Sequence, residues 1–145
     1  MIDPTQIPPI ADEELLARFI VNSNEVRADG TVRPQLFLPY QRVELSVNRH
    51  RDATLDETWA IGRQVAEQRG KTLLGRADLR ASACRTPPLD VEPRPILPQN
   101  PNHADVIRYP PRKDAQLSLA AKLAAAIEGE WKSPPSIDGE MGVEV

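Results

Sequence analysis

"RVELSVNRHRDATLDETWAIGRQVAEQRGKTLLGRADLRASAC", residues 42–84, is the stretch that decides the fold. Its first part, residues 42–49, alternates apolar and polar side chains, which is typical of a strand with one buried face. Thr54 and Glu57 then form the signature of a capping box, which indicates that a helix begins there. Gly70 ends this helix, and a second alternating run follows. The stretch therefore predicts a strand–helix–strand unit with the helix as a crossover connection.

The predicted helix over residues 54–69 carries an apolar stripe that should face a sheet. Trp59 is its largest member, and we expect it to pack against Leu45 and Leu79 on the two strands. Small residues on the apolar face of the second strand, Gly75 among them, would let the helix approach closely. The polar residues that alternate with them should then face solvent.

The flanking sequence completes one domain. Residues 11–23, "ADEELLARFIVNS", predict a helix capped by Asp12, with a strand over "LLARFIV" as the alternative. Residues 103–109 predict a short strand, and 114–128 an Ala/Leu-rich helix. Six prolines within 85–102 exclude a central strand there and favour ordered loop or edge structure. We predict an α+β fold, with an irregular lead-in over 1–11, a single compact domain over 12–128 whose small sheet is packed by two or three helices, and a disordered acidic tail over 129–145.

Composition restricts the class of protein. The chain has 145 residues, a net charge of −3 and a pI near 5.4, which argues against a dedicated nucleic-acid binder. Its single cysteine, Cys84, excludes an intramolecular disulfide and a cysteine-rich zinc site, and we expect neither a metal nor a cofactor. The sequence does not open on a signal-peptide pattern, and no apolar run approaches membrane-spanning length. These features predict a cytoplasmic protein without a membrane partner.

Two histidines are the first candidates for chemistry. His103 stands in "NPNHADV", residues 100–106, after the turn-forming pair Asn100-Pro101. In an extended segment Asp105 projects to the same side and could orient the imidazole for acid–base work or for a metal. We favour the structural alternative, in which His103 closes a rigid corner, with its ring mostly buried and bonded to backbone or to an acid. His50 ends the first strand, where α/β sites gather, although a solvated strand end has the same pattern.

Arginines form the second group of candidates. Arg76 and Arg80 share the polar face of the second strand, and Arg49 and Arg51 flank His50. Planar guanidinium groups suit phosphate, so these four residues are candidates for a nucleic-acid or anion site. The alternative is that they form salt bridges, because acidic residues are interleaved with them. We favour salt bridges for Arg76 and Arg80.

Three segments resemble a group of small uncharacterised bacterial proteins. They are "ELSVNRH" at 44–50, "LLGRADLRASA" at 73–83 and "NPNHADVIRYPPRKDAQLSLAAKLAAA" at 100–126. In that group a G-R-A-D strand accompanies an N-P-N-H-A turn and a W-P-x-x-K segment that opens a helix. This chain has Arg108-Tyr109-Pro110 where Gly-Trp-Pro is expected. The resemblance implies a compact single-domain bacterial protein and brings no activity with it.

Three functions are compatible with these observations. The first is a non-catalytic accessory or protein-interaction module of a bacterial cytoplasmic system. The second is nucleic-acid or nucleotide binding through the arginine-bearing strand, and the third is a histidine-dependent hydrolase, metal-assisted or acting on phosphodiesters. We favour the first because the pI is acidic, the loops are rich in proline, and the sequence contains no P-loop, G-x-S-x-G or H-E-x-x-H motif. It makes another protein the expected partner and leaves the oligomeric state open.

Overall fold

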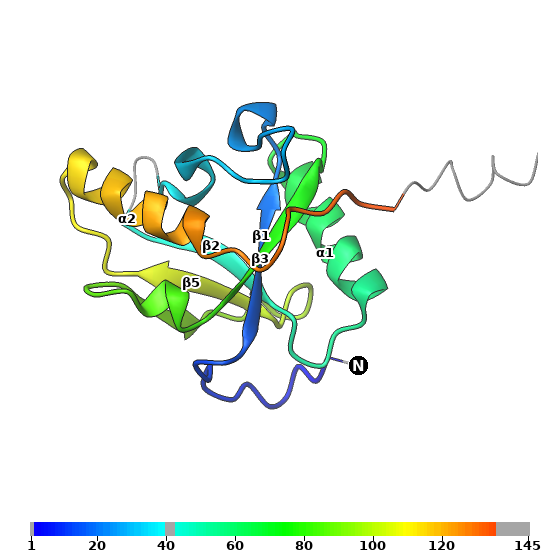
Figure 1. Cartoon of the computed structure of the whole chain (residues 1–145). Coiled ribbons are helices and arrows are strands. Elements are labelled where there is room, and N and C mark those ends of the chain that lie inside the picture. Colours follow the sequence, from blue (N-terminus) through cyan, green and yellow to red (C-terminus); the bar gives the residue numbers. More distant parts are fainter. Residues whose placement is uncertain (1, 40–42, 136–145) are drawn as a thin grey trace, which may run out of the picture.

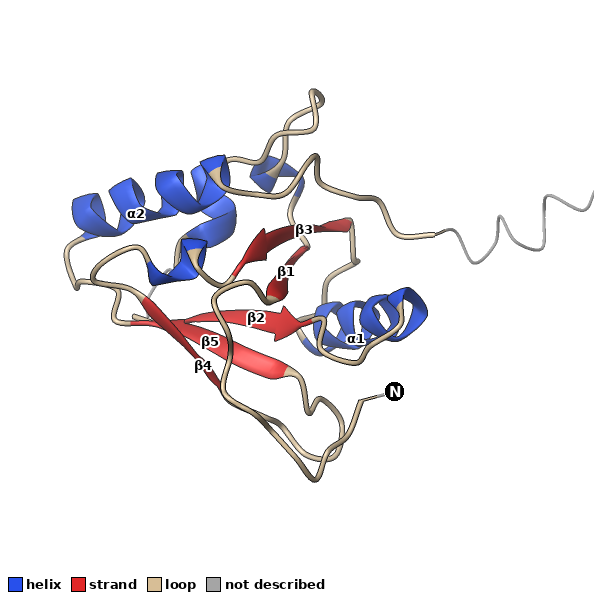
Figure 2. Ribbon diagram, turned by 60° about the horizontal axis from the view of Figure 1, so that its bottom comes forward, coloured by secondary structure: helices blue, strands red, loops and turns tan. Residues whose placement is uncertain are grey.

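The computed structural model describes residues 2–39 and 43–135 (Figure 1). Five antiparallel strands form one sheet in the order β3-β1-β2-β5-β4. Helices α1 and α2 lie on opposite sides of this sheet (Figure 2), so the fold is a single small α+β domain, as predicted. The elements in chain order are β1 (Leu15–Ile20), η1 (Ser23–Glu25), η2 (Pro34–Phe37), β2 (Leu45–Arg49), α1 (Leu55–Gln68), β3 (Gly75–Arg80), η3 (Ala83–Arg85), β4 (Asp90–Pro93), β5 (His103–Ile107) and α2 (Lys113–Ala125).

β1 is an inner strand that contributes to two apolar clusters. Leu16 and Ile20 belong to the larger core under α2, whereas Ala17 and Phe19 belong to the smaller core under α1. The prediction of a helix over 11–23 is therefore wrong, and its alternative, a strand, is correct. β1 is covered on both faces, so apart from Arg18 its sequence is apolar throughout and does not differ in periodicity from a buried helix.

The predicted strand–helix–strand unit is present, with β1 inserted between its two strands. Both β2 and β3 pair with β1 in antiparallel fashion, so they run parallel to each other and α1 crosses between them. The Glu57 amide donates to the Thr54 hydroxyl at 3.1 Å, and the Thr54 amide donates to the Glu57 carboxylate at 2.8 Å. Gly70 follows the helix with a φ of +67°, a conformation that costs glycine little. The capping box and the helix end are thus confirmed.

Trp59 is buried, but its neighbours differ from those predicted. It lies in the cluster under α1 together with Phe19, whereas Leu45 and Leu79 belong to the core on the far side of the sheet. The Arg76 guanidinium lies 4.6 Å from the centre of the Trp59 ring, which is a cation–π contact. The prediction is wrong because α1 packs on the face of β3 whose sequence is polar. An arginine in contact with an aromatic ring makes that face suitable for packing.

Glycines allow two close approaches to the sheet. A Cβ added at Gly62 would lie 2.6 Å from the Phe19 ring, so α1 comes close through its own glycine. A Cβ at Gly75 would lie 2.5 Å from the Lys132 carbonyl oxygen. Contrary to our expectation, Gly75 on β3 therefore makes room for the segment that follows α2. Lys132 and Arg76 exchange two backbone hydrogen bonds of 2.9 Å, so the predicted tail over 129–145 begins inside the domain; residues 136–145 lie outside the described residues.

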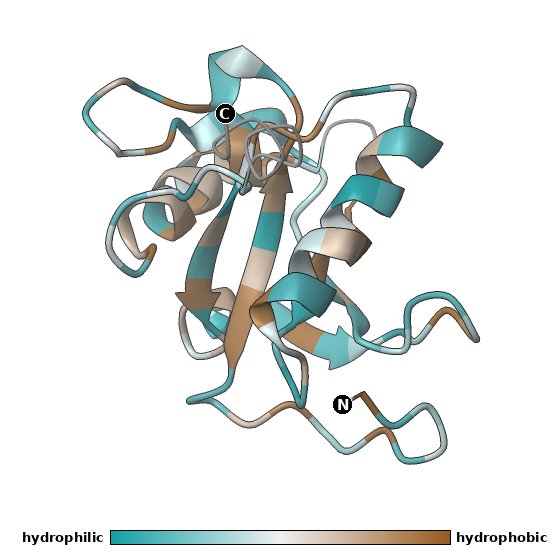
Figure 3. Ribbon diagram, turned by 90° about the vertical axis from the view of Figure 1, so that its right-hand side faces the viewer, coloured by the Kyte–Doolittle hydropathy of each residue, from teal (hydrophilic) through white to brown (hydrophobic). Residues whose placement is uncertain are grey.

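The proline-rich stretch forms edge structure, as expected. It contains β4, which is the last strand of the sheet and ends at Pro93. β5 and α2 lie close to their predicted positions, and α2 buries Leu119 and Leu123 in the larger core. Seen from the side of α1, the strands carry both hydrophobic and hydrophilic segments (Figure 3). Among the described residues, no helix combines the length and the apolar character that a membrane span requires.

Candidate functional site

One row of side chains crosses the sheet on the side of α1. In the strand registers Ala17 is opposite both Asp78 and Asn48, and Asn48 is opposite His103. The apolar cluster under α1 includes Ala17 and, within the described residues, contains no member from β2, β5 or β4. Helix α1 therefore covers the Asp78 end of the row. At the His103 end the sheet extends beyond the helix, which leaves a recess between the helix and the sheet.

A cleft of about 710 Å³ lies in this recess between α1 and the sheet. Its volume is within the range of small-ligand sites, and its lining combines apolar, amide and charged groups. α1 contributes Gln64, Val65 and Gln68, and Arg69 follows directly after the helix. Residues 44–48, which are most of β2 and the residue before it, form a second part of the lining. The loop between β4 and β5 contributes Ile96, Gln99 and Asn100. The lining is completed by residues of β1 and by His103, Lys113, Leu38 and Pro39.

The loop beside the cleft is held in place by hydrogen bonds. The buried side chains of Asn48 and Asn100 exchange two amide hydrogen bonds of 2.9 and 3.0 Å. Ile96 and Asn100 exchange two backbone hydrogen bonds that close the loop. His103 lies next to it, with Nδ1 at 2.9 Å from the Arg94 carbonyl oxygen. Because a carbonyl only accepts, Nδ1 carries the proton in this bond, and the expected contact of a mostly buried His103 with backbone is present.

Asp105 contacts Arg94 more closely than it contacts His103. Its carboxylate lies 3.2 Å from the Arg94 guanidinium and 3.9 Å from His103 Nε2. Burial raises the pKa of the Asp105 carboxyl, although the His103 and Arg94 charges act in the opposite direction. Arg94 also pairs with Glu92 at 3.0 Å and with Glu44 at 3.3 Å, and these hydrogen bonds raise its pKa. The imidazole is thus oriented by a backbone carbonyl, and Asp105 belongs to a cross-strand charge network.

His50 has its own partners at the covered end of the row. Its Nε2 lies 2.9 Å from an oxygen of Asp78, and the Arg76 Nε donates to the same oxygen at 3.0 Å. Burial raises the pKa of Asp78, but the hydrogen bonds from His50 and Arg76 outweigh it and hold the pKa below its ordinary value. In the part of the chain that the structure describes, no hydrogen bond or ion pair joins His50 to His103.

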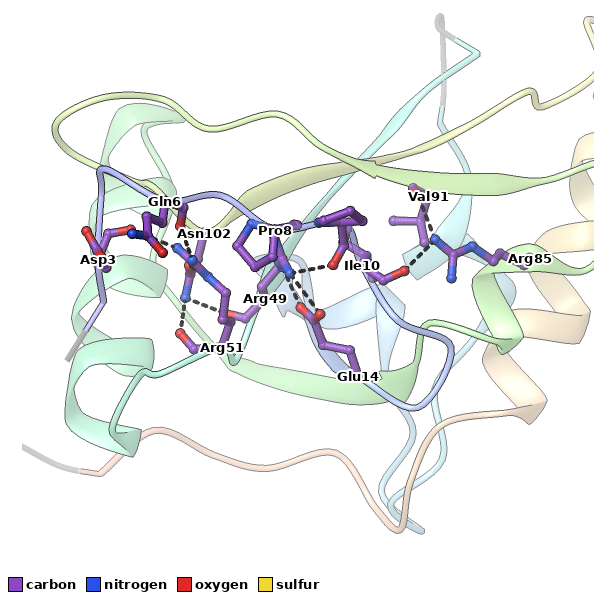
Figure 4. Close-up of polar contacts among 11 residues, drawn as sticks. Asp3, Gln6, Pro8, Ile10, Glu14, Arg49, Arg51, Arg85, Val91 and Asn102 are labelled. Carbon is purple, nitrogen blue, oxygen red and sulfur yellow. Dashed lines mark hydrogen bonds and ion pairs between the residues drawn. The ribbon is translucent and has the colours of Figure 1, made fainter.

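Three arginines hold the N-terminal segment against the domain, mostly through its backbone carbonyl groups (Figure 4). Arg49 is 1% exposed and donates to both carboxylate oxygens of Glu14 and to the carbonyls of Pro8 and Pro9. Arg51 donates to the carbonyls of Asp3 and Gln6 and to the Asn102 side chain, and Arg85 to the Ile10 carbonyl and to Asp12 and Asp90. The irregular lead-in is therefore attached by guanidinium groups rather than by strand pairing.

The four arginines proposed for an anion site are all engaged within the chain. Arg49 and Arg51 bind the N-terminal segment, and Arg76 binds Asp78. Arg80 lies 3.5 Å from the Glu128 carboxylate and donates to a backbone carbonyl at 2.9 Å. The favoured interpretation of Arg76 and Arg80 as members of salt bridges is confirmed.

Sequence reasoning missed the residues that shape the cleft. Arg69, Ile96 and Lys113 are far apart in the chain, and no motif links them. Cys84 is buried in the larger core, where burial raises the pKa of its thiol to about 12, so it is not a reactive thiolate at neutral pH. In residues 2–39 and 43–135, no group of three or more His, Cys, Asp or Glu side chains is arranged to hold a metal ion.

Comparison of the chain with models of known protein families, with curated proteins and with solved structures finds no match in any of the three.

Proposed function

We propose that this protein is a non-catalytic interaction module of a bacterial cytoplasmic system, and that its partner is another protein. The observation that carries the proposal is the loop between β4 and β5. Ile96 and Leu97 are adjacent there, 46% and 54% exposed, and Ile96 also lines the cleft. Isolated exposed apolar residues are common, but an adjacent pair at the rim of a cleft is what a docking site offers.

The rigidity of this loop supports a role in recognition. The two backbone hydrogen bonds between Ile96 and Asn100 and the paired Asn48 and Asn100 amides fix its conformation before any partner arrives. A preformed loop loses little conformational freedom on binding, so more of the apolar contact energy contributes to affinity. Burying apolar surface contributes about 25 cal/mol per Å² before the costs of association are subtracted.

The remaining candidate chemistry supports a non-catalytic module. His50 bonds to Asp78, and His103 bonds to a backbone carbonyl. Arg49 and Arg76 are buried and paired. Groups that already satisfy one another stabilise the fold and are not preorganised around a reacting atom.

An affinity capture from the native cytosol, performed with and without nuclease, tests the proposal. The full chain is the bait, and Leu97→Asp places a charge on the exposed loop. Leu117→Asp is the matched control, because Leu117 is 46% exposed on α2 and does not line the cleft. We expect wild type and Leu117→Asp to retain the same partner and Leu97→Asp to lose it. Equal capture by all three proteins, or capture that nuclease abolishes, would contradict the proposal.

A further inference from the structure

Two cationic side chains at the cleft have no partner among the described residues, unlike most arginines of the domain. The side chains of Arg69 and Lys113 are exposed and line the cleft, and neither makes a hydrogen bond or ion pair with any residue described in the structure. Most arginines of the domain, Arg49 and Arg76 among them, are engaged with carboxylates or carbonyls. Arg69 follows the last residue of α1, and Lys113 is the first residue of α2.

The other charges of the cleft lining are already neutralised or engaged. Arg18 is buried and donates to the carbonyls of Leu36 and Ser46. Glu44 is the lining carboxylate, and it pairs with Arg94 at 3.3 Å. Among the described lining residues, the charge that the cleft offers to a ligand is therefore positive, and it comes from side chains that a ligand can reach without breaking a bond to another described residue.

Apolar side chains accompany these two cations. Val65 on α1, Leu38 and Ile96 all line the same cleft. A ligand that satisfies the cleft must therefore carry both an acidic group and an aliphatic surface. Glu44 adjoins the carboxylates that gather around Arg94, so an acidic ligand is repelled from the β4 side and its charge is directed towards Arg69 and Lys113.

We infer that the cleft receives an acidic segment of the partner protein, with separate carboxylates paired to Arg69 and to Lys113 and an aliphatic side chain against Val65 and Ile96. This inference rests on the proposed function and specifies the chemistry of the partner. The exposed pairs contribute modestly to affinity and more to the rate and orientation of docking.

Selection of short random peptides displayed on phage, with the full-length protein as target, tests the inference. The selected peptides are then synthesised and titrated into wild type, Arg69→Glu and Lys113→Glu. The control is Lys122→Glu, which reverses an exposed lysine on the same helix as Lys113 but outside the cleft. We expect enrichment of Asp or Glu next to an aliphatic residue. Each cleft variant should weaken binding about threefold or more, and the control should leave it unchanged.

Three results would overturn the inference. The first is selection of neutral or basic peptides, or of none. The second is equal binding by Lys113→Glu and Lys122→Glu. The third is that a single-stranded DNA oligonucleotide binds wild type and loses affinity in Lys113→Glu, which would assign the two cations to nucleic acid. In each case a native partner that still depends on Leu97 would leave the proposed function standing, so the two failures are distinguishable.

Discussion

Replacing Arg49 with methionine should destabilise the domain strongly. The Arg49 side chain is 1% exposed and satisfies both carboxylate oxygens of Glu14 as well as the carbonyls of Pro8 and Pro9. Methionine fills much of the same volume but donates no hydrogen bond, so the Glu14 carboxylate loses its cation in a mostly buried position. Removing one member of a buried ion pair costs about 3–5 kcal/mol. Because Glu14 keeps a small contact with solvent, we expect a loss near the lower limit, about 3 kcal/mol.

The free energy of unfolding can be measured by urea titration followed by circular dichroism. The double variant Arg49→Met/Glu14→Gln should regain part of the loss, because it removes the uncompensated carboxylate. Arg112→Met is the control, since Arg112 and Asp114 pair at 2.8 Å but are largely exposed. An exposed pair is worth less than about 1 kcal/mol. Equal losses in Arg49→Met and Arg112→Met would refute the view that buried arginines hold the lead-in to the domain.

Two further predictions concern the row of side chains across the sheet. The pKa of Asp78 is lower in the folded state, so the ionised carboxylate stabilises the fold at pH values above its unfolded pKa, and this stability is lost as pH falls through its folded pKa. Asp78→Asn should therefore show a flatter dependence of stability on pH than wild type between about pH 5 and pH 2. An identical pH dependence in acid unfolding would contradict this assignment. His103→Leu should lose about 1 kcal/mol of stability, because the hydrogen bond to the Arg94 carbonyl disappears, whereas His103→Asn retains a donor and should lose less. Equal thermal unfolding of the two variants would show that this hydrogen bond contributes nothing to stability.

The sequence predicted those features correctly that depend on contacts between residues close in the chain. Thr54, Glu57 and Gly70 act through contacts within one turn, and α1 begins and ends where they predict. The same holds for Pro93, whose missing N–H fits an edge strand. β1 was predicted less well because periodicity reports which faces are apolar, and both of its faces are covered.

The candidate site depended on tertiary contacts that no local pattern encodes. Arg76 and Asp78 have the alternation of a solvated face, yet they are buried because Trp59 lies over Arg76 and His50 bonds to Asp78. The cleft exists because α1 covers β1 and β3 and does not extend over β2 and β5. Which strands a helix covers follows from strand order, and strand order is not visible in the sequence of any one element.

The central claim is that a partner protein docks at the rim formed by Ile96 and Leu97, and site-specific photo-crosslinking tests it most directly. A photoreactive amino acid is introduced at position 97 in one protein and at position 117 in another, both of which replace exposed leucines. After irradiation in the native cytosol, we expect a specific protein adduct from position 97 and none from position 117. Adducts of equal yield at both positions, or none at position 97, would contradict it.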